Sequence, residues 1–147
     1  MTAQQVNEFK RSTSGNMSNY LALIDLRLKS VAADLIFPSP RKPLELTASV
    51  LVDISRLSEF VTYDVKYALG AKDRDERDVL EATITLNLLF KIKDGMNPSE
   101  DELRAFGTFG SVDIAHPYMR EIVQTLTGRM GLPPLVLDVR APEPVEL

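Results

Sequence analysis

Four stretches of the chain alternate apolar and polar residues with a period of two, and this pattern limits the fold more than any other feature. In the clearest stretch, 44–55, every second residue is apolar: Leu44, Leu46, Ala48, Val50, Val52 and Ile54. The same alternation runs through 21–29, 60–69 and 80–92. Successive side chains of a strand point to opposite faces, so each stretch is typical of a half-buried strand. Four such stretches predict an antiparallel sheet with one wet face.

Proline and charged clusters separate the predicted strands. Segment 37–43 contains three prolines, which cannot donate hydrogen bonds to a sheet, so it is expected to be a connection. Segment 70–78 lies between two alternating stretches and is predicted to be a long hairpin loop. Its acidic and basic side chains are interleaved, which is typical of a solvated, self-compensating turn in which the opposite charges offset one another.

After Gly95 the pattern changes from strand to helix. Asn97 as N-cap, Pro98 at the first helical position and three acids at 100–102 predict a helix start. Pro117 is expected to kink or restart the helix, and Gly131 is a natural C-terminal cap. The predicted fold class is therefore α+β, a four-stranded antiparallel sheet with a kinked C-terminal helix pair packed on one face.

The chain of 147 residues has the usual size of one domain. We expect a disordered, polar N-terminal arm over 1–19, a single domain over 20–140 and a proline-rich tail over 141–147. No stretch reaches the length of about 18 apolar residues typical of a membrane helix, and none resembles a signal peptide. We therefore expect a soluble, cytoplasmic protein, and the absence of cysteine fits a reducing compartment without proving it.

The composition argues against several kinds of chemistry. A net charge of -4 and a pI near 5.0 disfavour nucleic acid and anionic membranes as partners. His116 is the only histidine, and without cysteine the usual transition-metal site cannot form, so it is expected to be a cap or surface residue. The turn acids lack the calcium-loop pattern, and Arg120 and Glu121 are typical of surface or interface ion pairs. We predict no catalytic residue, no metal site, no cofactor and no enzyme activity.

Apolar residues on polar strand faces remain unexplained. Leu51, Phe60 and Leu89 stand on nominally wet faces, where single apolar residues are common. Together they make oligomerisation or peptide binding plausible.

The segment from Ala115 to Val139, AHPYMREIVQTLTGRMGLPPLVLDV, resembles the SecB chaperone family. The residues that carry the resemblance are Pro117, Tyr118, Arg120, Glu121, Gly131, Pro133, Leu135 and Leu137. The order of four strands and a kinked helix over 20–140 agrees with that family. The resemblance implies a sheet with helices on one side, assembled as a dimer of dimers through helices and sheet edges. It also implies binding of unfolded client chains without ATP.

The resemblance also suggests which residues carry these contacts. Ala48, Val50, Val52, Leu135 and Leu137 would border a client-binding groove, although core packing explains each of them equally well. Tyr118, Arg120 and Ile122 are predicted at the oligomer interface.

Members of this family that serve protein export pass preproteins to the SecA motor and continue into a further helix and tail. This sequence instead ends at Leu147 with two more prolines, which puts coupling to SecA in doubt. The phrase TGRMGLPPL is more similar to the SecB-like chaperones of toxin-antitoxin-chaperone modules, which serve stress response or phage defence. We therefore expect an antitoxin as client. A general export chaperone and a purely structural oligomeric module are the alternatives.

Overall fold

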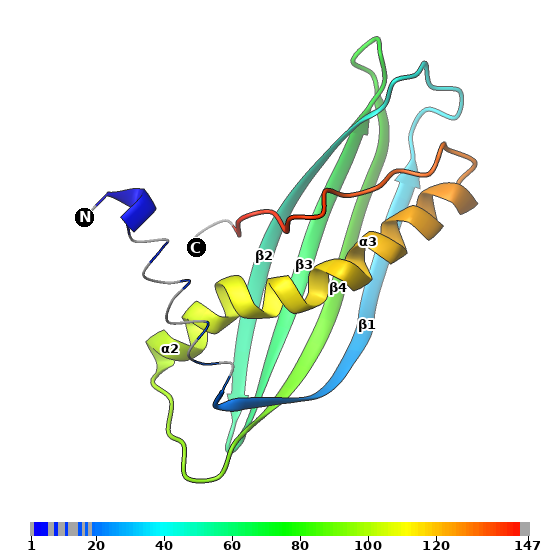
Figure 1. The fold of residues 1–147 in the computed structure, drawn as a ribbon. Helices are drawn as coiled ribbons and strands as arrows, with labels where there is room; N and C mark the ends of the chain where they lie inside the picture. Colours follow the sequence, from blue (N-terminus) through cyan, green and yellow to red (C-terminus); the bar gives the residue numbers. More distant parts are fainter. Residues whose placement is uncertain are drawn as a thin grey trace.

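The computed structural model describes residues 2–5, 8, 11, 15, 17 and 19–144. Its centre is one antiparallel sheet of four strands, in the order β1-β4-β3-β2 (Figure 1). The strands are β1 (Leu21–Leu35), β2 (Glu45–Leu57), β3 (Phe60–Lys72) and β4 (Asp78–Ile92). A helical layer lies across one face of this sheet, so the predicted fold class is confirmed.

The first strand is longer than its alternation indicated, because two bulges shift the pattern. Its pairing with β4 changes register between Leu23 and Asp25 and again between Leu28 and Ser30. Each bulge adds one residue to one strand of a pair, so the following side chains change face. Alternation therefore resumes out of phase after Lys29, where the sequence pattern stopped.

The helical layer is one continuous run of three pieces: α2 (Glu100–Ala105), the π-helix η1 (Phe106–Ser111) and α3 (Val112–Arg129). The predicted N-cap at Asn97 is wrong by two residues. Ser99 caps α2 instead, since its hydroxyl accepts from the Glu102 backbone N–H while the Glu102 side chain accepts from the Ser99 N–H. This reciprocal pair is a capping box, which satisfies two backbone donors at the helix start.

The irregular part of the helical run lies at η1, whereas α3 continues through Pro117. The predicted restart at Pro117 is therefore wrong. A close packing contact accompanies the π-helix. A Cβ atom on Gly107 would lie 2.7 Å from Cε1 of Tyr63, so only glycine fits there without displacing the ring.

The core lies between the helical layer and the two middle strands. Tyr63 and Tyr67 of β3 and Leu86 and Leu88 of β4 are almost wholly inaccessible to solvent. The C-terminal segment, residues 131–144, returns across the sheet beside α3 (Figure 1). Its buried residues complete the cover: Leu132, Leu135 and Leu137.

Most of the predicted N-terminal arm lies outside the described residues. Met17, which the sequence assigned to that arm, is fully buried and packs in the core. At this one position the segment 1–19 therefore contributes an apolar side chain to the core.

The loop between β3 and β4 is built around a buried carboxylate. The side chain of Asp73 is inaccessible to solvent and pairs with Arg77 at 2.8 Å. It also accepts backbone N–H groups of Asp75, Arg77 and, from the β1–β2 connection, Arg41. These donors hold the pKa of Asp73 well below its usual range. The loop is self-compensating as predicted, but at Asp73 it is not solvated.

Candidate functional site

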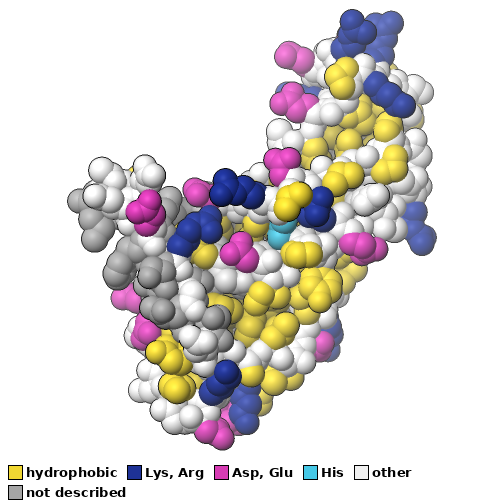
Figure 2. Space-filling model, viewed as in Figure 1, with side chains coloured by type: hydrophobic (Ala, Val, Ile, Leu, Met, Phe, Trp, Pro, Cys, Tyr) yellow, Lys and Arg dark blue, Asp and Glu magenta, His cyan; other side chains and the backbone are white. Residues whose placement is uncertain are grey.

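The helical layer is narrower than the sheet that it covers. On β1, four of the side chains that face the helical layer are exposed, at 44% for Leu23, 52% for Leu28, 42% for Val31 and 38% for Leu35. We call these four residues the β1 strip. Figure 2 shows hydrophobic side chains gathering over the sheet on both sides of the helical band. Extended apolar surface of this kind marks a site where a partner binds.

The opposite edge of the sheet carries a second uncovered row, which we call the β2 strip. It consists of the helix-side residues Leu46, Ala48, Val52 and Ile54, of which the first three are half-buried and Ile54 is 36% exposed. Val50 lies between them and is fully buried. The apolar surface is therefore split between the two edge strands, while the middle strands are covered.

Tyr67, His116 and Asp138 connect the sheet, α3 and the C-terminal segment. The Tyr67 hydroxyl lies 2.6 Å from His116 Nδ1, and His116 Nε2 lies 2.6 Å from the Asp138 carbonyl oxygen. A carbonyl oxygen can only accept, so Nε2 carries the hydrogen and Nδ1 accepts from the hydroxyl. Burial raises the pKa of Tyr67, and the charge of Asp113 raises it further, so the phenol remains a donor. Both ring nitrogens are thus engaged in holding the structure together.

Two more side chains of α3 hold the same segment. Arg120 donates from Nε to the Leu137 carbonyl oxygen at 3.0 Å. The Leu135 backbone N–H donates to the Thr127 hydroxyl, also at 3.0 Å. Side chains rather than a sheet ladder therefore fix the path of the C-terminal segment.

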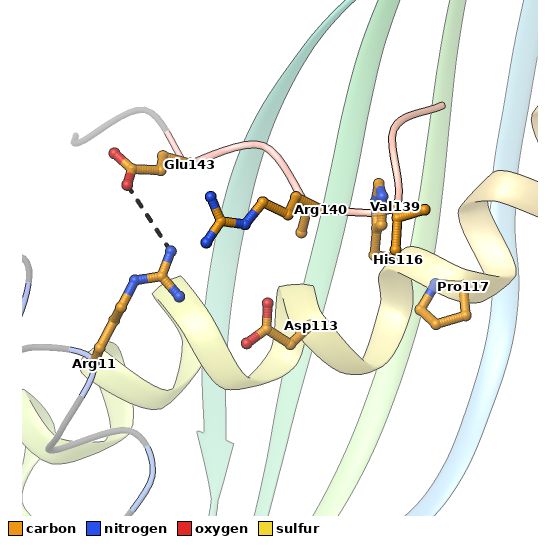
Figure 3. Close-up of a pocket in the computed structure, with 8 residues that line it drawn as sticks. Arg11, Asp113, His116, Pro117, Val139, Arg140 and Glu143 are labelled. Carbon is orange, nitrogen blue, oxygen red and sulfur yellow. Dashed lines mark ion pairs between the residues drawn. The ribbon is translucent and has the colours of Figure 1, made fainter. Parts of the chain in front are cut away.

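A cavity of about 600 Å³ lies between α3 and the C-terminal segment (Figure 3). Arg11, Arg140 and Asp113 direct their charged groups into it, and Arg11 pairs with Glu143 at 3.9 Å. Its wall includes His116, whose ring nitrogens are both occupied. The described residues contain no cluster of three or more histidines or carboxylates placed to hold a metal ion.

The residues predicted for peptide binding fall into two groups. Ala48 and Val52 belong to the β2 strip and keep accessible surface. Val50, Leu135 and Leu137 are buried in the core, at 0%, 9% and 6% exposure. These three side chains therefore belong to the core and not to the accessible apolar surface.

The residues predicted at an oligomer interface lie on two sides of α3. Tyr118 is 53% exposed, and Ile122, one turn further along the same side, is half-buried. Arg120 points to the other side, where it holds the C-terminal segment. Within the chain, the Nε of its guanidinium is engaged by the Leu137 carbonyl oxygen.

Sequence reasoning missed the β1 strip beyond Leu28 and the Tyr67–His116–Asp138 connection. The two bulges interrupt the alternation, so the sequence pattern does not reveal the strip. The part of the sequence that still indicates it is the run Val31, Ala33 and Leu35, in which apolar residues alternate in a new phase. No local pattern in the sequence could reveal the connection, since its members lie far apart along the chain.

Comparisons with known proteins extend this picture. A scan against protein-family models finds no match. The chain is 32% identical over 142 residues to the SecB-like chaperone MT2006 of Mycobacterium tuberculosis, covering 82% of this chain and 78% of the relative. It is 39% identical over 80 residues to the SecB-like chaperone Rv1957 of the same species, covering 52% of this chain and 44% of the relative.

A solved structure agrees with the fold. The M. tuberculosis Rv1957 SecB-like chaperone, in complex with a ChAD peptide from the Rv1956 HigA1 antitoxin, superposes with a TM-score of 0.81 at 24% identity. The match covers 90% of this chain and 99% of that one.

The fold, a four-stranded sheet with a helical layer on one face and uncovered edge strands, is that of a SecB-type domain. With the identity to MT2006 across most of both chains, this chain belongs to the SecB-like chaperone family. The resemblance predicted from the segment 115–139 is thereby confirmed. Among the helices of the described residues, none combines the length and apolar character that a bilayer crossing requires.

Proposed function

We propose that this chain is an ATP-independent cytoplasmic chaperone that holds unfolded or aggregation-prone polypeptide. The observation that carries the proposal is the apolar surface left uncovered along both edge strands, in the β1 and β2 strips. Unfolded chains expose apolar side chains, and burial of such surface stabilises by about 25 cal/mol per Å². Affinity for exposed apolar chain needs no nucleotide, because no step of the binding requires an energy source.

The proposed client is the antitoxin of a toxin-antitoxin-chaperone module, acting in stress response or phage defence. Support comes from Rv1957, whose solved structure holds a ChAD peptide from the HigA1 antitoxin and shares this fold. The genomic neighbourhood tests this assignment. A toxin and antitoxin pair beside the gene supports it, whereas an isolated gene favours export and coupling to SecA.

The client surface is assigned to the β2 strip. Ala48 and Val52 contact the client directly, and buried Val50 supports them from the core. Leu135 and Leu137 anchor the C-terminal segment that borders this surface. The small side chain of Ala48 leaves room for larger client residues.

The β1 strip is assigned to self-association as a dimer of dimers. On α3, Tyr118 is exposed and Ile122, one turn further along the same side of the helix, is half-buried, and both are assigned to the same association. Specific interfaces contain fully buried apolar cores rimmed by polar groups, and four exposed aliphatic residues plus a tyrosine are suited to that role. A purely structural oligomer would use this surface and bind no client.

The test is suppression of aggregation without nucleotide. Guanidine-unfolded rhodanese is diluted into buffer with a stoichiometric amount of the protein, and light scattering is followed. The proposal expects the scattering to fall strongly, and Ala48→Arg to weaken the effect while circular dichroism stays unchanged. Full aggregation in the presence of a folded, soluble protein would contradict it and favour the structural oligomer.

A further inference from the structure

The C-terminal segment runs beside α3 as an extended chain that belongs to no sheet (Figure 1). Burial alternates along it, since Leu135 and Leu137 are buried whereas Val136 and Asp138 are exposed. Among the described residues, no backbone-to-backbone hydrogen bond joins positions 133–144 to a strand. The main chain of this segment is therefore held by something other than a ladder.

Three side chains of α3 form hydrogen bonds to this segment, and each of them reaches its main chain. The pairs are Thr127 with the Leu135 N–H, Arg120 with the Leu137 carbonyl oxygen, and His116 with the Asp138 carbonyl oxygen. None of these bonds depends on which side chains the segment carries. Main-chain hydrogen bonds combined with pockets for alternate side chains are the means by which proteins bind extended peptides of differing sequence. The contacts from α3 are thus suited to a foreign polypeptide as well as to the chain's own.

The segment is held firmly where it leaves α3 and loosely further on. Leu132 is buried, and its N–H donates to the Thr127 carbonyl oxygen at 3.1 Å. By contrast, Val139 is 79% exposed and borders the cavity of about 600 Å³ between the segment and α3. The ion pair beyond it, Arg11 with Glu143, joins two exposed side chains, and exposed pairs stabilise little. A competing chain can therefore begin to replace the segment at its Val139 end.

We infer that residues 135–144 form a strap that occupies a polypeptide-binding site of this chain, and that the client displaces this strap from α3. The inference rests on the proposed function and adds a closed, self-occupied state to it. The displacing part of the client is an extended stretch with two apolar residues at alternate positions, because these residues replace Leu135 and Leu137. The side chains of α3 that held the strap then bond to the main chain of the client.

A reversible disulfide tests whether the strap has to leave. The chain contains no cysteine, so Thr127→Cys combined with Leu135→Cys offers one intramolecular pair, at positions already joined by a contact of 3.0 Å. Anisotropy measures the binding of labelled, reduced and carboxamidomethylated α-lactalbumin, which has no thiol of its own. Oxidation should weaken binding by about tenfold or more, equivalent to about 1.4 kcal/mol, and dithiothreitol should restore it. The two single variants, treated with the same oxidant, are the controls.

Equal binding by the oxidised and reduced forms of the double variant would overturn the inference and leave the proposed function standing. Failure of the wild-type protein to bind the unfolded client at all would instead contradict the proposed function itself.

A truncation within the strap gives a test in which the sign of the effect decides. Leu137→Ala loosens the strap and leaves the side chains of α3 unchanged, so client binding should tighten by about tenfold. Val136→Ala is the matched control, because Val136 is the adjacent residue and is 53% exposed, and it should leave the affinity unchanged. Weaker binding by a folded Leu137→Ala variant would show that Leu137 supports the client surface, and would overturn the inference.

Amide hydrogen exchange reports the displacement directly, read residue by residue by NMR with and without saturating client. The Leu135 amide, which bonds to the Thr127 hydroxyl, should exchange about tenfold faster or more in the complex. The Leu132 amide should keep its rate, because it lies where the segment stays attached to α3. A Leu135 amide that exchanges at its free rate or more slowly in the complex would overturn the inference.

Discussion

The Tyr67 hydroxyl and His116 Nδ1, 2.6 Å apart, join the middle of the sheet to the N-terminal part of α3. Their rings are also stacked, with centroids 5.8 Å apart. Through Nε2 the same histidine reaches the Asp138 carbonyl oxygen, so one side chain positions both the helix and the C-terminal segment.

Replacing His116 by alanine should therefore release the C-terminal segment and lower the free energy of unfolding. The change leaves the Tyr67 hydroxyl and the Asp138 carbonyl without this partner, at a cost of about 1–3 kcal/mol for a buried group. Urea unfolding measures the stability, and limited proteolysis measures the release. Thr125→Ala is the control, because that exposed hydroxyl bonds only the Glu121 carboxylate. Unchanged protease resistance in His116→Ala would contradict the anchoring role.

Gly107→Ala and Gly128→Ala should act in opposite directions. The new methyl group at Gly107 would lie 2.7 Å from the Tyr63 ring, whereas nothing lies within 4 Å of the one at Gly128. Overpacking costs about 1–3 kcal/mol, while an exposed helical glycine changed to alanine gains about 0.5–1 kcal/mol. Thermal unfolding of both variants checks this, and equal melting temperatures would show that the Tyr63 contact is not tight.

Asp73→Asn should destabilise the protein at neutral pH and lose this effect in acid. The pKa of Asp73 is lowered by Arg77 and by backbone donors, so the ionised form is favoured in the folded state. Its contribution is complete above the unfolded carboxyl pKa of about 3.9 and is lost as pH falls toward the lowered value. Unfolding curves of wild type and variant from pH 7 to pH 2 should converge below about pH 4. A constant difference over this range would contradict the ionised role.

Leu28→Glu should weaken self-association. Leu28 lies within the β1 strip and is 52% exposed, so a carboxylate there would be desolvated in an interface at that surface. Sedimentation velocity should show a smaller species at the same concentration. Leu57→Glu is the control, because Leu57 is 79% exposed but lies on the other edge strand. A similar loss of assembly in both variants would argue against the β1 strip as the interface.

Much of this fold could be predicted from the sequence, because alternation at 44–55 and 80–92 reports directly which side chains face the helical layer. The helix start was misplaced by two residues because Asn97 and Ser99 are both good N-caps, and only the partner at Glu102 decides between them. The β1 strip could not be predicted without the positions of the two bulges, and these depend on the pairing of β1 with β4.

The candidate site was harder to predict, because the exposure of a side chain on the sheet depends on whether the helical layer is wide enough to cover it. Ala48, Val50 and Val52 share one strand face, yet only the middle residue is fully buried. His116 and Asp73 were expected near the surface because polar residues usually are. Their burial depends on hydrogen-bond partners that come from other segments.

The most direct test of the central claim compares two forms of one protein as clients. Fluorescently labelled α-lactalbumin is titrated with the chaperone in the absence of nucleotide, once native and once reduced and carboxamidomethylated, and anisotropy is measured. The account predicts saturable binding of the unfolded form and none of the native form, with weaker binding by Ala48→Arg. Absence of binding to the unfolded form, or equal binding to both forms, would contradict it.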